Sequence, residues 1–166
     1  MAQRVLTLAL PDDDATAALG ARLGAHARAG DVIALVGDLG AGKTTLARGL
    51  IRHMTGPETE APSPTFPLVQ TYETPAFPIW HFDLYRLEHP GEARELGMEE
   101  AVDGLALIEW PERLGRDLPA QRLEVQLSFG GPERIGGGRI ARLVDFDDWS
   151  ARIDGDWRPN FEQESP

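Results

Sequence analysis

A glycine-rich segment near the start of the sequence has the residue types and spacing needed to hold a phosphate chain. Residues 37–44 read Gly-Asp-Leu-Gly-Ala-Gly-Lys-Thr and satisfy the Walker A, or P-loop, pattern G-x-x-x-x-G-K-[ST] in full. Glycines let backbone N–H groups approach phosphate oxygens, and a helix that starts here presents its positive end to the same anion. We expect Lys43 to reach the β and γ phosphates and the Thr44 hydroxyl to ligate Mg²⁺. Nucleotide contacts are expected from Gly37, Asp38, Leu39, Gly40, Ala41, Gly42, Lys43, Thr44 and Thr45.

The scarcity of lysine and asparagine bears on which nucleotide would bind. Lys43 is the single lysine in the sequence, and Asn160 is the single asparagine. GTPases of the Ras type read guanine with an Asn-Lys-x-Asp motif, which this sequence cannot supply. ATP is therefore the expected nucleotide.

A carboxylate that can hold Mg²⁺ beside the phosphates is expected at the end of a buried strand. The apolar run 105–108 ends at Glu109. Glu109 is therefore the first candidate for a metal ligand from outside the phosphate loop. Asp83 is the second candidate, because His81, Asp83 and Tyr85 share one strand face by their spacing of two residues. The alternative for Asp83 is a strand with a polar, solvent-exposed face.

Two further residues are candidates for sensing or contacting the nucleotide. Thr65 lies in the segment Ser-Pro-Thr-Phe at 63–66, where a switch threonine could respond to the γ phosphate, although the segment by itself is also typical of a simple turn. Trp110 adjoins Glu109 and is a candidate nucleotide contact, with ordinary packing as the alternative. The candidates for catalysis are therefore Lys43, Thr65, Asp83 and Glu109.

The elements around these residues follow the order strand, loop, helix that an α/β domain needs. Strands are expected at 3–9, 32–36, 68–72, 79–85, 105–108, 122–129 and 139–146, and helices at 12–28, 43–54 and 92–102. Continuous apolar runs such as 32–36 are typical of central parallel strands covered on both faces. We expect a single P-loop NTPase-like α/β domain over residues 1–149, with central parallel strands, antiparallel additions and flanking helices. Residues 150–166 are expected to form an acidic, flexible tail.

Composition narrows the classes of function. The sequence has 166 residues, of which 42% are hydrophobic and 26% charged, so a wholly disordered or coiled-coil chain is excluded. The formal net charge of −11 argues against direct, tight nucleic-acid binding. The absence of cysteine excludes disulfides and thiolate metal sites and favours a reducing compartment. With no signal-peptide core and no membrane-spanning run, a cytoplasmic protein without membrane contact is expected.

Several motifs coincide in order along the chain: GDLGAGKTT, SPTF, HFDLYR, GMEEAVDG and LALIEWPERL. Together they resemble the TsaE (YjeE) family, the bacterial ATPase of tRNA threonylcarbamoyladenosine modification, over roughly residues 10 to 130. The resemblance implies a magnesium-dependent ATPase that acts with TsaB and TsaD and turns over slowly without them. It implies that tRNA is contacted only indirectly, through that complex.

The same resemblance assigns roles residue by residue. Lys43 and Thr44 match the phosphate and magnesium positions of the family, and Thr65 matches its SPTF threonine. Asp83 matches the aspartate of H-x-D-x-Y-R, where orienting the attacking water and supporting magnesium through water are both open. Glu109 and Trp110 match the I-E-W segment.

Two other functions fit the same phosphate loop. A P-loop kinase of a small metabolite would use Arg113, Arg116 and Arg122 as an arginine-bearing lid over its acceptor. A nucleotide-switched interaction module would bind ATP, hydrolyse it negligibly and use Thr65 to report the bound state.

Overall fold

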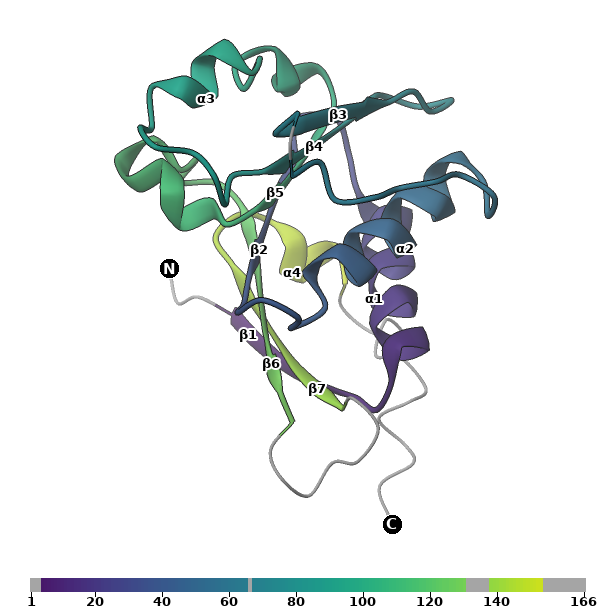
Figure 1. Ribbon diagram of the computed structural model, residues 1–166. Helices are drawn as coiled ribbons and strands as arrows, with labels where there is room; N and C mark the ends of the chain where they lie inside the picture. The colour runs from purple at the N-terminus through teal and green to yellow at the C-terminus, as the bar shows by residue number, and fades with distance from the viewer. Residues whose placement is uncertain (1–3, 66, 131–137, 154–166) are drawn as a thin grey trace.

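One seven-stranded sheet forms the centre of the computed structural model, which describes residues 4–65, 67–130 and 138–153 (Figure 1). The strands lie in the order β1-β7-β6-β2-β5-β4-β3. Their bounds are β1 Arg4–Leu10, β2 Val32–Val36, β3 Val69–Tyr72, β4 Ile79–Asp83, β5 Leu105–Glu109, β6 Leu123–Phe129 and β7 Arg139–Asp145. The four central strands β6, β2, β5 and β4 are parallel, whereas β3, β7 and β1 join antiparallel at the two sides. The expected α/β class, with parallel centre and antiparallel additions, is confirmed.

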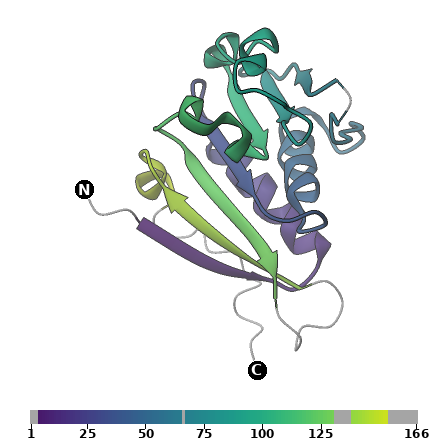
Figure 2. The same cartoon turned by 60° about the vertical axis from the view of Figure 1, so that its left-hand side comes forward.

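Two long helices, α1 (Asp13–His26) and α2 (Lys43–Thr55), pack against each other on one face of the sheet (Figure 2). The Asp12 carboxylate begins α1 by accepting a hydrogen bond of 2.8 Å from the Ala15 N–H. Glycines let the two helices approach closely, because a Cβ at Gly20 would lie 2.0 Å from the Leu46 carbonyl oxygen. α1 ends at His26, two residues before the expected end, because the backbone of Ala27 is extended.

The opposite face of the sheet is covered by residues 84–104 and 110–118, the segments before and after β5. They contain the short helices α3 (Glu92–Glu95), η1 (Glu100–Asp103) and η2 (Pro111–Asp117), which pack on Phe82 and Ile108 of the sheet. The single helix expected over 92–102 is wrong. Gly97 interrupts it with a φ of +89°, a left-handed conformation that ends the helical hydrogen bonding.

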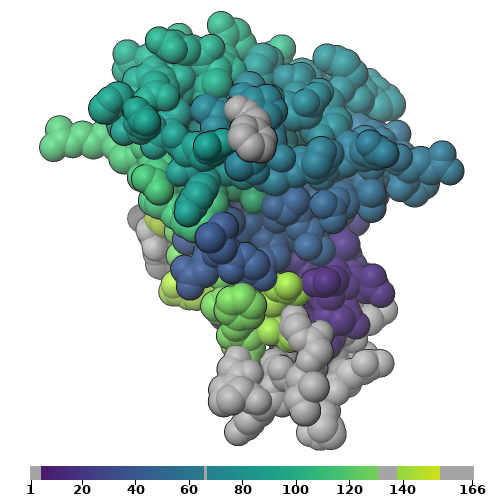
Figure 3. Space-filling view, in the orientation of Figure 1, coloured from purple at the N-terminus to yellow at the C-terminus, as the bar shows by residue number. Residues whose placement is uncertain are grey.

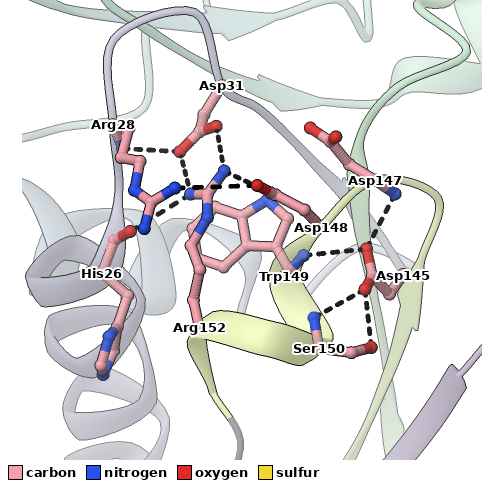
Figure 4. Close-up of polar contacts among 9 residues, drawn as sticks. All are labelled: His26, Arg28, Asp31, Asp145, Asp147, Asp148, Trp149, Ser150 and Arg152. Atoms are coloured by element: carbon pink, nitrogen blue, oxygen red, sulfur yellow. Dashed lines mark hydrogen bonds and ion pairs between the residues drawn. The ribbon is translucent and has the colours of Figure 1, made fainter.

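A last short helix, α4 (Trp149–Arg152), closes the described chain and is held to the core (Figure 4). The Asp145 carboxylate accepts hydrogen bonds from the N–H groups of Trp149 and Ser150 and from the Ser150 hydroxyl. Trp149 is fully buried, and Ile153 belongs to the same hydrophobic cluster as α1 and α2. The packed structure therefore continues through Ile153, past the boundary expected after residue 149. The rest of the expected tail, residues 154–166, lies outside the described residues.

An ion-pair cluster fixes α4 to the turn before β2. The Arg152 guanidinium donates to both oxygens of Asp31, at 2.6 and 2.9 Å, and to Asp148 at 2.6 Å. Arg152 and Asp31 are 7% and 5% exposed, so this pair is largely removed from water. The paired carboxylates raise the pKa of Arg152 above its ordinary value despite burial.

Candidate nucleotide site

The glycine-rich loop lies between the end of β2 and the start of α2, as the strand-loop-helix order predicts. Gly40 and Gly42 have φ values of +80° and +103°, which a residue with a side chain would adopt only with strain. Gly42 is the N-cap of α2, and the first turn of α2 carries no acidic side chain. The N–H groups and positive dipole of α2 are therefore directed at the loop without a competing carboxylate on the helix, as an anion site requires.

Lys43 is folded back over the loop. Its side chain is buried, and Nζ donates to the carbonyl oxygens of Gly37 and Asp38. Nζ also lies 3.9 Å from the centroid of the Trp110 ring, within the range of a cation–π contact. Burial lowers the pKa of Lys43, and the surrounding carboxylates, Glu109 foremost, offset only part of that shift. The ammonium thus lies beside the start of α2, between the two carbonyl oxygens and the Trp110 ring.

Glu109 is held on both of its oxygens at the end of β5. The Thr44 hydroxyl donates to Oε1 at 3.1 Å, and His81 Nε2 lies 2.7 Å from Oε2. His81 and Glu109 are both buried. Among the described residues His81 Nδ1 has no hydrogen-bond partner, which favours the tautomer that carries its proton on Nε2 and donates it to Glu109. The carboxylate orientation is therefore set from two sides.

Asp83 lies beside Glu109, because β4 and β5 are parallel neighbours and these two residues are in register. The Ser63 hydroxyl donates to Asp83 Oδ2 at 2.5 Å, and the Thr65 hydroxyl lies 3.5 Å from the same oxygen. The Tyr85 N–H donates to Oδ1 at 3.1 Å. Asp83 and His81 are buried, so the alternative of a solvent-exposed strand face does not hold for them, whereas Tyr85 lies beyond the end of β4 and is exposed. The segment that contains Ser63 and Thr65 is thereby attached to the carboxyl end of β4.

These groups surround one cavity of about 520 Å³. Its lining residues are Asp13, Asp38, Leu39, Gly40, Gly42, Lys43, Thr44, Thr45, Ser63, Thr65, Asp83, Tyr85, Glu109, Trp110 and Arg139. In the space-filling view the blue phosphate loop lies on the face toward the reader, between teal atoms above and green, yellow-green and purple atoms below (Figure 3). All four candidate catalytic residues therefore share a cavity with the phosphate loop, whereas Gly37 and Ala41 are not among its lining residues.

Sequence reasoning did not assign four residues of this cavity, Asp13, Ser63, Tyr85 and Arg139. Ser63 and Tyr85 each lie two residues from one that it did assign, unlike Asp13 and Arg139. The latter two come from the start of α1 and the start of β7, and Arg139 Nη1 lies 2.6 Å from Asp13 Oδ1. No local pattern signals such a pair, because its members are distant in sequence. The role of His81 was also missed, although its place on the strand was expected.

The arginines expected for a kinase lid are not brought to the cavity. Arg122 pairs with Glu124 at 3.0 Å and lies over the Phe146 ring. Arg113 lies 5.8 Å from the Tyr85 ring, and neither it nor Arg116 is among the lining residues of the cavity in the described chain.

The sheet order and the glycine-rich loop between β2 and α2 define an α/β protein with a P-loop-like fold. The same fold occurs in the crystal structure of YdiB from Bacillus subtilis, with a TM-score of 0.75 and 26% sequence identity over 92% of this chain and 93% of that one. No helix within the described ranges is long and apolar enough to span a membrane.

The chain belongs to the TsaE family. The family model described as "Threonylcarbamoyl adenosine biosynthesis protein TsaE" matches residues 10–135. The tRNA threonylcarbamoyladenosine biosynthesis protein TsaE of Rickettsia felis is 46% identical over 121 residues, 72% of this chain and 71% of the relative. The protein of the same description from a Nostoc species is 41% identical over 82% of this chain and 84% of the relative. The role of the chain therefore lies in tRNA threonylcarbamoyladenosine biosynthesis.

Proposed function

We propose that the chain binds ATP with Mg²⁺ and hydrolyses it in support of tRNA threonylcarbamoyladenosine biosynthesis, in complex with TsaB and TsaD. The observation that carries this proposal is the hydrogen bond of 3.1 Å between Thr44 and Glu109. It joins the phosphate loop to the carboxylate at the end of β5, so the two groups that a nucleotide-bound cation needs lie side by side. The net charge of −11 supports contact with tRNA through the partners.

The donor chemistry of the cavity fits Mg²⁺. Mg²⁺ prefers oxygen ligands, and the Thr44 hydroxyl and the Glu109 carboxylate supply two, with the Asp83 carboxylate adjacent for contact through water. Bound Mg²⁺ would supply Lewis-acid stabilisation of the charge that develops on the phosphates during hydrolysis. His81 keeps Glu109 in the orientation in which its other oxygen meets Thr44.

The remaining residues have distinct parts in the proposed reaction. Lys43 exchanges its carbonyl partners for the β and γ phosphates, and its charge stabilises the leaving group. Asp83 accepts a hydrogen bond from the attacking water or from a water on the cation, while Ser63 and Thr65 fix the Asp83 side chain. The partners complete the site in this proposal, so slow turnover that TsaB and TsaD accelerate is the expected behaviour.

ATP turnover by the purified chain, measured with and without TsaB and TsaD, tests this proposal. We expect Mg²⁺-dependent release of phosphate at a rate that rises when the partners are added. Lys43→Ala is expected to lower this rate by about tenfold or more, since charge-assisted phosphate contacts supply a few kcal/mol. Arg142→Gln is the matched control, because Arg142 is exposed on β7 and donates to Gln126 away from the cavity. Binding of ATP without turnover under both conditions would contradict hydrolysis and favour a nucleotide-switched module.

A further inference from the structure

Arg139 reaches from the first position of β7 to the phosphate loop. Its Nη2 lies 3.4 Å from the Gly40 carbonyl oxygen, and a Cβ added to Gly42 would lie 2.8 Å from its Nε. The side chain is 12% exposed, so it is packed along the loop and does not extend into solvent. Residues 10–135 match the family model, and Arg139 lies beyond them. The cavity thus receives a cation from a part of the chain that the family model does not cover.

The charge of the cavity makes this cation significant. Four acidic side chains line it, Asp13, Asp38, Asp83 and Glu109, against two basic ones, Lys43 and Arg139. A nucleotide phosphate chain is strongly anionic, so an excess of carboxylates opposes its binding unless each available cation is used. Arginine also presents a planar fork of donors that matches phosphate oxygens better than a point charge does.

One partner of Arg139 within the cavity is a carboxylate in an exposed position. Asp13 is 70% exposed and meets the guanidinium at 2.6 Å from the first turn of α1. An exposed partner of this kind is easily displaced, because its attraction to the guanidinium is screened by water. A phosphate group also offers anionic oxygen acceptors to the guanidinium, and the phosphate chain of a nucleotide carries more negative charge than the Asp13 carboxylate.

We propose that Arg139 is a phosphate-binding residue of the nucleotide site and that Asp13 occupies its guanidinium until the nucleotide displaces it. The inference rests on the proposed function, since it assumes that the cavity takes a nucleoside triphosphate. Its consequence is that the two members of the ion pair act in opposite directions on nucleotide affinity. Loss of Arg139 removes a contact, whereas loss of the Asp13 charge removes a competitor and a repulsive carboxylate.

Calorimetric titration of the full chain with ATP and Mg²⁺ tests the inference. We expect Arg139→Gln to weaken binding by about tenfold or more, and Asp13→Asn to tighten it by about twofold to tenfold. Arg139→Lys keeps the charge without the fork, so it is expected to retain more affinity than Arg139→Gln. Arg142→Gln removes the same charge from the same strand outside the cavity and is expected to change the affinity less than about twofold.

A purely structural ion pair would give a different pattern. Both Arg139→Gln and Asp13→Asn would then lower affinity together, or both would leave it unchanged, and either result would overturn the inference. Thermal unfolding of each variant by circular dichroism establishes that the folded protein was titrated. If the parent binds ATP and Arg139→Gln binds it equally well, this inference alone is wrong. If the parent does not bind ATP with Mg²⁺, the proposed function is wrong as well.

Discussion

Replacement of Arg152 by methionine is expected to destabilise the fold severely, because the buried Asp31 carboxylate then keeps the hydrogen bond from the Arg28 N–H but loses its ion-pair partner. Arg152 donates to both Asp31 oxygens, and neither side chain is more than 7% exposed. Breaking a buried ion pair by removing one member costs about 3–5 kcal/mol. Methionine keeps an unbranched stem that can still lie against the Trp149 ring, so the loss reports mainly the missing charge. For a domain of this size the expected fall in Tm is roughly 6–20 °C.

Urea unfolding, followed by circular dichroism, measures this loss against a matched control. Arg28 also pairs with Asp148, but at 3.7 Å and with side chains that are 65% and 53% exposed (Figure 4). Arg28→Met is therefore expected to cost about 0–1 kcal/mol. In a double-mutant cycle Arg152→Met and Asp31→Asn should together cost less than the sum of the single changes, because the second change removes the unpaired charge that the first one leaves. Equal unfolding free energies for Arg152→Met and Arg28→Met would refute the reasoning.

Three further predictions concern the site and the end of the chain. His81→Leu should raise the Mg²⁺ concentration needed for half-maximal turnover and cost about 1.5–3 kcal/mol in stability, because it leaves Glu109 without the ring donor. His81→Gln keeps a donor and should cost less; equal losses would exclude positioning of Glu109. Glu109→Gln and Asp83→Asn should each lower ATP turnover with TsaB and TsaD more than ATP affinity, and a parental rate in either variant would remove its assigned role. Burial raises the pKa of Asp145, but hydrogen bonds from Ser150 and its neighbours outweigh burial and hold this pKa below its ordinary value. The charged carboxylate therefore stabilises the fold at pH values above the ordinary pKa, and this contribution is lost as the pH falls. Asp145→Asn should therefore cost about 1–2 kcal/mol at pH 7 and less in acid, by urea unfolding across pH; a constant difference would contradict this.

The phosphate loop and the strand ends could be predicted because their signals are local. A fixed spacing of glycines, lysine and threonine specifies a loop before a helix, and the apolar run before Glu109 specifies a buried strand that ends in a carboxylate. The hydrogen bond between Thr44 and Glu109 then follows from parallel strands that end at one edge of the sheet. The sequence therefore predicts the centre of the site, although the roles of its residues stay predictions.

The pairs that close the site and the fold could not be predicted, because each joins segments distant in sequence. Asp13 meets Arg139, and Asp31 meets Arg152, only after the sheet has formed. A weak local signal for α4 was present: Trp149 and Ile153 are spaced by four, as Asp148 and Arg152 are. The acidic composition around it hid that signal and favoured a flexible tail from residue 150.

The pairing of β1 with β7 has a consequence for how the chain folds as it is made. Arg4 lies opposite Asp145, so the first described strand forms its ladder with the last strand of the sheet. At synthesis rates of about 5–20 residues per second, β1 waits on the order of ten seconds for its partner. During that interval β2, α2, β4, β5 and β6 can assemble around the phosphate loop, while the backbone donors of β1 remain without their final acceptors. The unpaired edge of β1 is therefore open to pairing with another chain until β7 is made and its ladder with β1 forms.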